Sequence, residues 1–529
     1  MLIRLSQIRV PLEYNEKKLR RAVVTKLKCH VSAVKDIEII SRSIDARSAK
    51  NQPSYSVSVE CELNLDEVPK HLRQNEVKVI ERTSEPELKK VTNIPKERVL
   101  VVGAGPAGLM AGLELAKAGL KPLIIDRGAD AEIRSKQVDE FWAENVLDEE
   151  SNVLFGEGGA GLFSDGKLTA RSKDNYRMNN FFDVLVQCGA DPAIKIDNLP
   201  HVGSDLLMKI CPKIRQMIID AGGEVKFNTR LDQLVISNGS LQAAVINGKK
   251  LNISHCVLAI GHSARDTYKM LYETGVKLDP KAFAVGVRVE LPQKQVNKSQ
   301  WGRWCNLPSL GAASYRLTRK AEKNYRSCYS FCMCPGGTVI SCASEAEYVT
   351  SNGMSLHARD LPFANAAFLV PVTPSDFPPT EPSELSGIEY QRRIEEKVYK
   401  AAGYGLPASS LTDFTTGTIP EKLPAKRSFT NAVPADLNQI LPREIAETLK
   451  SSIPKMLRQM RRVELDHTLI YGAETRSSSP VRIVRNEACT AVGVEGLYPT
   501  GEGAGYAGGI VSSAIDGIRI AEAIIKKQS

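Results

Sequence analysis

Residues 99–128 read VLVVGAGPAGLMAGLELAKAGLKPLIIDRG, and this stretch decides the fold of the chain. Its first four residues, 99–102, are an apolar run typical of a buried parallel strand. The three glycines of a G-x-G-x-x-G turn follow: Gly103, Gly105 and Gly108. A helical pattern and a second apolar run come next, and that run ends on Asp126. Strand, glycine turn, helix, second strand and acid together are typical of a βαβ dinucleotide-binding unit.

Each glycine of this turn has a separate role in binding a dinucleotide. Gly103 permits the tight turn, Gly105 lets a pyrophosphate approach the backbone, and Gly108 lets helix and strand pack closely. The helix N-terminus offers free N–H groups and a partial positive charge to the phosphates. Asp126 is placed to accept hydrogen bonds from the adenosine ribose and would repel a 2′-phosphate, which disfavours NADP. The alternative is an α/β unit whose glycines serve packing alone.

Length, charge and cysteine use limit the class of protein. The chain has 529 residues, enough for two or three domains, and its net charge of +9 is too mild to indicate nucleic acid. No apolar run reaches the length of a membrane span, and residues 1–10 lack the apolar core of a secretion signal. The eleven cysteines are scattered without a C-x-x-C pair. We therefore expect a cytoplasmic protein with no membrane or nucleic-acid partner.

A second glycine-rich stretch, FGEGGAGLFSDGKL, occupies residues 155–168. Its five glycines rule out a regular helix or strand and suit a backbone loop held against a ligand. Such a loop offers N–H groups to phosphate oxygens or to a ring edge, and Lys167 adds a positive charge there. The alternative is a flexible surface loop.

A later apolar run, 256–261, ends on Gly261 and would complete the sheet of a flavin-binding domain. His262 follows directly and could lie near a ring system, or it could be a structural hydrogen-bonding residue. Strands that alternate in the antiparallel manner begin at 283–291.

Two further features lie in this antiparallel region. On a regular strand, Cys332 and Cys334 would point to the same face, as a redox or thiolate pair or as two small hydrophobic residues. Arg476 is a candidate anchor for a carboxylate or another anion. No metal site is predicted, because no other Cys or His pair has ligand spacing.

The two ends of the chain complete the predicted organisation. Near the C-terminus, Glu502 follows a short strand and is placed to hold ribityl hydroxyls. The helix that starts at 508–510 is placed to face the pyrimidine edge of a flavin, where its dipole would stabilise the reduced form. At the other end, residues 1–82 show a strand–helix–strand–strand order, which suggests a ferredoxin-like half, and 83–97 suits a linker.

The sequence also resembles a known group of proteins. The pieces that carry the resemblance are GAGPAG with DRG, FGEGGAGLFSDGKL, VLAIGHSARD, FCMCPGG, SNGMSLHARD, ETRSSSP and GEGAGYAGG. They run from about residue 40 to the C-terminus and are similar to FAD-dependent oxidoreductases with a glutathione-reductase-type FAD domain. The resemblance is greater to a bacterial FAD-dependent dehydrogenase family without an assigned substrate. Related flavoproteins usually have aspartate where this chain has Glu502, and glutamate keeps the carboxylate.

The resemblance implies FAD bound in one split domain with an inserted substrate domain. Two-nucleotide disulfide reductases carry a second fingerprint and an active C-x-x-C, and this chain has neither. Any nicotinamide donor, NADH or NADPH, would therefore bind only transiently.

These observations predict an α/β protein: a split Rossmann-like FAD-binding domain with an inserted α+β substrate domain and a small N-terminal ferredoxin-like α+β domain. The expected boundaries are 1–95 for the N-terminal domain and linker, 96–275 and 471–529 for the two parts of the FAD domain, and 276–470 for the substrate domain. The predicted FAD-binding residues are Gly103, Gly105, Pro106, Ala107, Gly108, Asp126, Arg127, Gly158, Gly159, Ala160, Gly161, Ser164, Gly166, Lys167, Leu168, Leu231, Ala259, Gly261, Gly501, Glu502, Gly508, Gly509 and Ile510.

The leading functional hypothesis is an FAD-dependent oxidoreductase that exchanges a hydride between flavin N5 and a small-molecule substrate. Arg476, Lys167 and His262 are its candidate catalytic residues. A second hypothesis is a non-catalytic flavin-binding regulator or scaffold that acts through a basic N-terminal domain. A third places NAD in the fingerprint, but the glycine-rich turn near the C-terminus argues against it.

Overall fold

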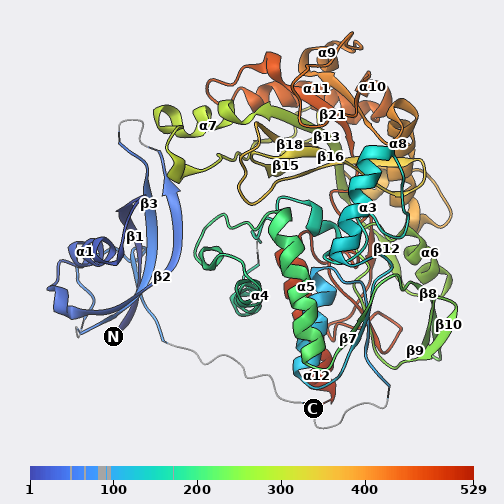
Figure 1. Cartoon of the computed structure of the whole chain (residues 1–529), viewed down its shortest axis with the longest axis horizontal. Coiled ribbons are helices and arrows are strands. Elements are labelled where there is room, and N and C mark those ends of the chain that lie inside the picture. The colour runs from blue at the N-terminus through green and yellow to red at the C-terminus, as the bar shows by residue number, and fades with distance from the viewer. Residues whose placement is uncertain (48–50, 65–66, 82–90, 92–96, 171, 529) are drawn as a thin grey trace.

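The computed structural model describes residues 1–47, 51–64, 67–81, 91, 97–170 and 172–528. Figure 1 shows a main body built on two large sheets, with a smaller N-terminal unit beside it. The linker predicted at 83–97 lies largely outside the described residues. No helix in the described part of the chain combines the length and the apolar character needed to cross a membrane.

A five-stranded parallel sheet lies at the centre of the part that carries the fingerprint. Its order is β23-β11-β5-β6-β7, so a strand from near the C-terminus joins strands from residues 100–258. The strands are β5 (Leu100–Val102), β6 (Leu123–Ile125), β7 (Glu224–Lys226), β11 (Cys256–Leu258) and β23 (Leu497–Pro499). Because side chains alternate along a strand, Val101 and Val257 pack into one core and Leu100 and Leu258 into another on the opposite face.

Different elements cover the two faces of this sheet. Helices α2, α5 and α12 pack together on one face, with α3 and α4 outside them (Figure 1). Their bounds are α2 (Pro106–Lys117), α3 (Ala131–Glu144), α4 (Asn175–Gln187), α5 (Ser204–Asp220) and α12 (Ile510–Gln528). The other face carries helix α6 and an antiparallel sheet in the order β10-β9-β8. These are β8 (Leu231–Ser237), β9 (Ser240–Ile246), β10 (Lys249–Asn252) and α6 (Arg265–Glu273).

The second large sheet has seven strands in the order β14-β15-β18-β13-β21-β19-β20, and only the β19–β20 pair is parallel. Its strands are β13 (Phe283–Pro292), β14 (Thr318–Arg319), β15 (Cys328–Cys334), β18 (Phe363–Val372), β19 (Leu406–Ser410), β20 (Ala432–Pro434) and β21 (Leu469–Glu474). Two antiparallel pairs accompany it: β16 (Thr338–Glu345) with β17 (Tyr348–Met354), and β12 (Leu278–Pro280) with β22 (Val481–Ile483).

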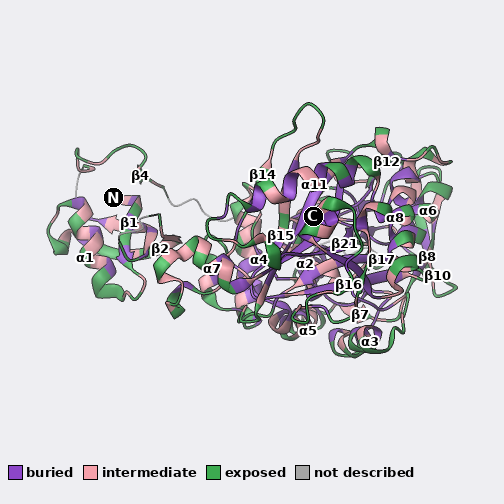
Figure 2. Cartoon of the chain, turned by 90° about the horizontal axis from the view of Figure 1, so that it is seen from above, coloured by how far each residue is buried: buried purple, intermediate pink, exposed green. Residues whose placement is uncertain are grey.

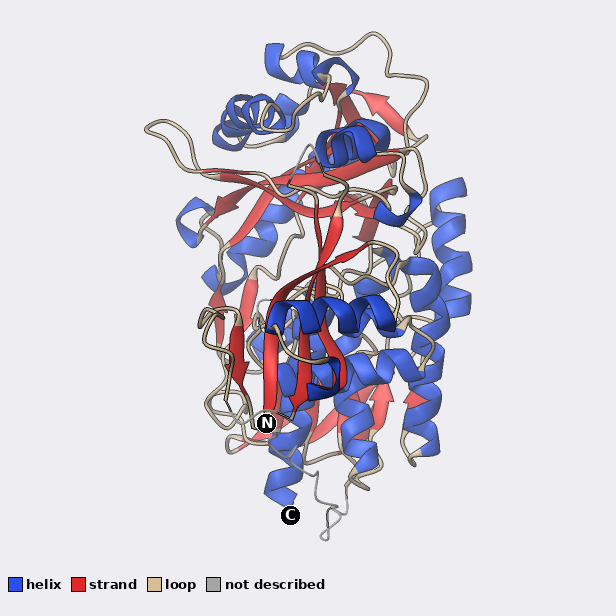
Figure 3. Ribbon diagram, turned by 90° about the vertical axis from the view of Figure 1, so that its left-hand side faces the viewer, coloured by secondary structure: helices blue, strands red, loops and turns tan. Residues whose placement is uncertain are grey.

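Helices lie over the outer side of this second sheet, as Figure 3 shows. Apolar side chains of α10 and α11 and of strands β13, β18 and β21 form one core. The helices of this part are α7 (Gln293–Trp301), α8 (Ser386–Ala402), α9 (Leu411–Thr416), α10 (Leu437–Ile440) and α11 (Arg443–Leu457). Short 3₁₀ turns occur at Val31–Ala33, Gly159–Phe163, Pro192–Lys195, Gly302–Trp304, Pro308–Leu310, Pro374–Asp376, Ser383–Leu385 and Leu465–His467.

The N-terminal unit is an antiparallel sheet in the order β2-β3-β1-β4 with one helix against it. Its elements are β1 (Leu2–Pro11), α1 (Glu16–Leu27), β2 (Val34–Asp45), β3 (Ser54–Leu63) and β4 (Val77–Val79). The Asn15 side chain caps α1 by accepting from the Lys18 N–H at 3.0 Å. Strand β4 was not predicted, because a three-residue strand carries too little alternation to be recognised.

This unit contacts the main body through the edge strand β2, and Figure 2 shows it standing to one side. The Arg42 backbone N–H donates to the Ile196 carbonyl at 2.7 Å, and its carbonyl accepts from the Asn198 N–H at 3.0 Å. The Arg42 guanidinium also forms an ion pair with Asp197, in which Nη2 lies 3.1 Å from Oδ2.

We expect Arg42→Ala to loosen this contact while leaving each folded unit intact. The ion pair joins the two units, whereas the matched pair of Arg9 and Asp45, at 2.7 Å, lies within the N-terminal unit. Small-angle X-ray scattering should therefore give a larger radius of gyration for R42A than for R9A. Identical scattering from the two variants would show that the backbone contacts alone hold the units together.

Candidate functional site

The glycine turn after β5 is closed by contacts that leave no room for a side chain. A Cβ on Gly103, whose φ is +102°, would lie 2.3 Å from the Ala259 carbonyl oxygen. A Cβ on Gly108 would lie 1.8 Å from the Gly103 carbonyl oxygen. Gly105 is the N-cap of α2, provides no side-chain cap and is followed by Pro106 at the start of the helix. The first turn of α2 therefore presents its N–H groups to a ligand.

Asp126 directly follows β6 and links the glycine turn to residue 128. One carboxylate oxygen accepts from the Ala104 N–H at 2.7 Å and the other from the Gly128 N–H at 2.9 Å. Burial raises the pKa of Asp126, and the two backbone N–H groups oppose that rise. The contacts that the structure shows for this carboxylate are thus to the protein backbone, and the ribose contact stays a prediction.

A cleft of about 570 Å³ lies on the Asp126 side of the turn. Arg127 lines it and pairs with Glu150 at 2.7 Å, while its guanidinium stacks over the Phe155 ring. Leu231 begins β8 between two lining residues, Arg230 and Asp232. The cleft has a lining of mixed charge and lies beside the fingerprint, and both properties suit an adenosine group.

The glycine-rich loop of residues 156–161 lies against the fingerprint. The Gly158 N–H donates to the Ala104 carbonyl at 2.9 Å, and a Cβ on Gly159 would lie 3.2 Å from the Gly105 Cα. A Cβ on Gly161 would lie 2.9 Å from the Ile510 side chain. Residues 158–161, Ala160 included, therefore connect the fingerprint to the start of α12.

Arg134 fixes this loop and was not predicted. Its buried guanidinium donates to four backbone carbonyls, those of residues 152, 153, 156 and 157. Nothing in the amphipathic pattern of α3 distinguishes Arg134 from a solvated arginine.

The second half of the 155–168 stretch does not face the fingerprint. Ser164 donates to the Gly161 carbonyl at 2.7 Å, a Cβ on Gly166 would lie 2.6 Å from the Gly203 nitrogen, and Leu168 is buried in the helical core. Ligand contact by Gly166 and Leu168 stays a prediction, and it would have to come from their backbone. The glycines of this stretch therefore serve two purposes. Those before residue 163 allow close packing against the fingerprint and α12, and Gly166 allows close packing against Gly203.

The C-terminal glycine turn converges on the same place. A Cβ on Gly501 would lie 2.8 Å from the Ala107 Cβ, and a Cβ on Gly517 of α12 would lie 2.1 Å from the Ala107 carbonyl oxygen. A Cβ on Gly503 would lie 2.5 Å from the Gly261 carbonyl oxygen. The segments near 103–108 and 501–517 are therefore in direct contact, although about 400 residues separate them in the sequence.

Glu502 and the start of α12 leave groups open for a ligand. The Glu502 carboxylate accepts no hydrogen bond from the described residues, and burial raises its pKa to about 7, opposed by the positive charge of Lys281. Added Cβ atoms on Gly508 and Gly509 would meet nothing within 4 Å. An unpartnered carboxylate and an open helix start fit the ribityl hydroxyls and the ring edge of a flavin.

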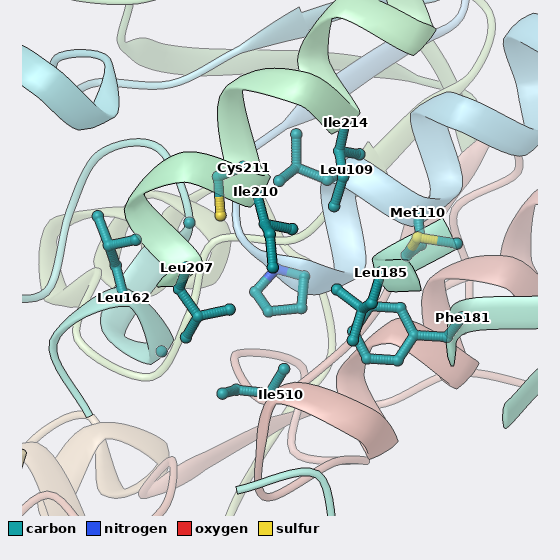
Figure 4. A pocket seen from close by; sticks show the side chains of 13 residues that line it. Leu109, Met110, Leu162, Phe181, Leu185, Leu207, Ile210, Cys211, Ile214 and Ile510 are labelled. Carbon is teal, nitrogen blue, oxygen red and sulfur yellow. The ribbon is translucent and has the colours of Figure 1, made fainter. Parts of the chain in front are cut away.

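Ile510 contributes its backbone rather than its side chain to this open face. The side chain points into a small apolar cavity of about 30 Å³ beneath the turn (Figure 4). Leu109, Leu162 and Leu207 are among the other lining residues.

The three predicted catalytic residues have different surroundings. Arg476 is buried and paired with Glu395, with Nε and Nη2 at 3.0 and 2.7 Å from its oxygens. An internal carboxylate thus pairs with the guanidinium that the sequence offers as an anchor for a substrate anion, and anion binding by Arg476 stays a prediction. Glu395 lies on α8, about 80 residues away, and no local pattern links the two.

The other two candidates, His262 and Lys167, differ in their contacts. Burial, with the charges of Arg476 and Arg265, lowers the pKa of His262 to about 4, and its Nδ1 lies 2.9 Å from the Ser263 Oγ. His262 is thus neutral at pH 7. Lys167 pairs with Asp165 at 3.1 Å and donates to the Met333 carbonyl of β15, which joins the glycine loop to the second sheet.

The glycine turns, the open start of α12 and the free Glu502 define a nucleotide-binding α/β protein of the flavoprotein class. Residues 96–138 match a family model described as an FAD binding domain, and residues 282–477 match one described as FAD-dependent protein, C-terminal domain-like. Residues 2–62 match a domain of unknown function. An uncharacterized protein of Clostridium beijerinckii is 44% identical over 536 residues, covering 100% of this chain and 99% of the relative.

The chain belongs to the same family as this clostridial protein, a family of FAD-dependent proteins, and its cofactor is FAD. Among solved structures, quinol fumarate reductase FrdA of E. coli matches with a TM-score of 0.38 at 11% identity, over 83% of this chain and 71% of that one. L-proline dehydrogenase from P. horikoshii matches with a TM-score of 0.33 at 12% identity, over 82% of this chain and 95% of that one.

Proposed function

We propose that the protein is an FAD-dependent oxidoreductase whose small-molecule substrate binds between the FAD-binding elements and the seven-stranded sheet. The observation that carries this proposal is the meeting of the two glycine turns next to an open helix start and an unpartnered carboxylate. FAD supplies two-electron transfer at the flavin ring. The residues of 276–470 would form the substrate domain, because their sheet contributes β15, whose Met333 carbonyl accepts from Lys167. We call this boundary between the FAD-binding elements and the seven-stranded sheet the seam.

The side chains at this seam have distinct tasks in the proposal. The backbone N–H groups of α2 hold the pyrophosphate, and Glu502 holds the ribityl chain. Lys167 offers a cation to the substrate, and neutral His262 offers a hydrogen bond rather than a proton, since its pKa is lowered to about 4. NADH or NADPH, if it is the donor, would bind in the seam and leave.

We expect the purified protein to show the visible absorbance of oxidised flavin, and to lose it anaerobically when the correct reductant is added. The measurement is an anaerobic screen of metabolites, NADH and NADPH that follows flavin colour. Folded protein that binds no FAD on reconstitution would contradict the proposal. Flavin that binds but is reduced by no compound in the screen would instead favour a regulator or scaffold acting through the N-terminal unit.

A further inference from the structure

The strand β15 leaves its regular pairing at two cysteines. Phe331 pairs with Ala367 of β18 but Cys334 pairs with Asn365, so the register shifts between them. Cys332 has φ of +42°, in the left-handed region that side chains rarely adopt. The regular strand on which Cys332 and Cys334 were expected to share one face is therefore interrupted by a bulge between Phe331 and Cys334.

The bulge brings the two thiols together. The Cys334 Sγ lies 3.3 Å from the Cys332 carbonyl oxygen, and the two side chains are within hydrogen-bonding reach of each other. Cys332 is partly exposed and Cys334 is buried. Cys332 is thus the more exposed residue of the pair.

Two cations stabilise a negative charge at this pair. Arg288 is buried, donates to the Cys332 carbonyl at 3.3 Å and has Nη1 3.9 Å from the Cys334 Sγ. Lys167 donates to the carbonyl of the residue between them, Met333.

Acidic groups pair with both of these cations, and Arg359 adds a third positive charge beside Asp165. Glu474 pairs with Arg288 at 2.7 Å, and Asp165 pairs with Lys167 at 3.1 Å while also accepting from Arg359 at 3.0 Å. Glu502 is close enough for its charge to interact with Cys332.

The two cysteines consequently differ in acidity. The hydrogen bond from Cys334, with the charges of Lys167 and Arg288, lowers the pKa of the Cys332 thiol, and the shared proton raises that of Cys334. At other cysteines, burial is the main influence and raises the pKa of the thiol. These are Cys61, Cys188, Cys211, Cys256, Cys328 and Cys342.

We propose that Cys332 and Cys334 are a dithiol–disulfide couple that reduces a small-molecule disulfide at the seam. The Cys332 thiolate attacks one substrate sulfur, a mixed disulfide forms, the substrate S–S bond breaks and one thiolate leaves. Cys334 then gives its proton to the departing thiolate and attacks the Cys332 sulfur, which releases the second substrate thiolate. Two electrons pass from the dithiol to the substrate, and a Cys332–Cys334 disulfide remains.

The return step rests on the proposed function. The internal disulfide accepts two electrons and one proton from reduced FAD, which restores the thiolate at Cys332 and the thiol at Cys334. Glu502 follows β23 and its charge interacts with Cys332, which supports placing the couple on the side of the seam where we propose that FAD binds.

The first test needs no turnover and uses the full chain. We expect iodoacetamide to modify Cys332 on the order of tenfold faster at pH 6 than the partly exposed Cys305 and Cys489, because an ordinary thiol with a pKa of about 8.5 is almost fully protonated there. Mass spectrometry of peptides identifies the modified residue. The midpoint of the rate against pH should rise in K167M and recover in K167R. A midpoint for Cys332 near that of an ordinary thiol would overturn the proposal.

The second test uses an aromatic disulfide, 5,5′-dithiobis(2-nitrobenzoate), as the probe. Wild type and the control C489S should each release two thiolates from the pair and become two hydrogen atoms lighter through the Cys332–Cys334 bond. C334S should stop at a mixed disulfide on Cys332, and C332S should lose both reactions. Absence of the internal bond in wild type would overturn this proposal and leave the oxidoreductase proposal standing, whereas flavin that no reductant bleaches would overturn the latter and leave the thiol chemistry intact.

Discussion

Replacing Gly108 by alanine is expected to weaken FAD binding severely. The new Cβ would lie 1.8 Å from the Gly103 carbonyl oxygen, and both groups belong to backbone that cannot rotate away. The turn and the first turn of α2 would have to separate, at a cost of about 3 kcal/mol. We expect FAD affinity to fall about 100-fold, as measured by titration of FAD into flavin-stripped protein.

Gly112→Ala is the matched control on the same helix. Its Cβ would also be crowded, 2.3 Å from an atom, but that atom is the terminal Cδ1 of Ile124, a flexible side chain. Alanine also favours the helix over glycine by up to about 1 kcal/mol. G112A should keep its affinity for FAD, and a loss equal to that of G108A would show that helix packing rather than the phosphate turn is being measured.

Replacing Glu395 by glutamine is expected to destabilise the protein by about 3–5 kcal/mol. Glu395 accepts from Arg476 at 2.7 Å and from Arg265 at 2.9 Å, and all three side chains are buried. Without the carboxylate, two buried guanidinium groups would be left with incomplete partners. Urea unfolding followed by circular dichroism measures the loss. Glu396→Gln removes the neighbouring, exposed pair with Lys400 and should cost far less, because exposed ion pairs contribute little to stability.

The same carboxylate predicts a dependence of stability on pH. The two arginines hold the pKa of Glu395 below its unfolded value, so the stabilisation is present above about pH 4.3 and is lost as the pH falls. In E395Q this part of the acid-induced loss should disappear. Parallel acid dependence in wild type and E395Q would contradict the assignment of the charge to this network.

The backbone of the site could be predicted where the chain conformation itself requires glycine. At four glycines any side chain would meet backbone or a packed side chain, so only glycine fits and its spacing can be recognised in the sequence. These are Gly103 and Gly108 in the first turn and Gly501 and Gly503 near the C-terminus. Their meeting in space follows from β23 entering the parallel sheet beside β11.

Long-range side-chain pairing could not be predicted in the same way. Arg476 appears as an anion anchor in the sequence, but its partner Glu395 is brought to it by the packing of α8 against β21. Arg288 and Glu474 lie on neighbouring strands and give no local signal. The bulge at Cys332 departs from the two-residue alternation on which strand prediction depends, so the arrangement of its thiols emerged only from the structure.

The central claim is that the turns at 103–108 and 501–510 hold opposite ends of one FAD molecule. An electron-density map of crystals grown with FAD tests it most directly. We expect pyrophosphate density at the start of α2, ribityl density beside Glu502 and ring density at the start of α12. Well-ordered FAD density that lies elsewhere, or contact with only one of the two turns, would contradict it.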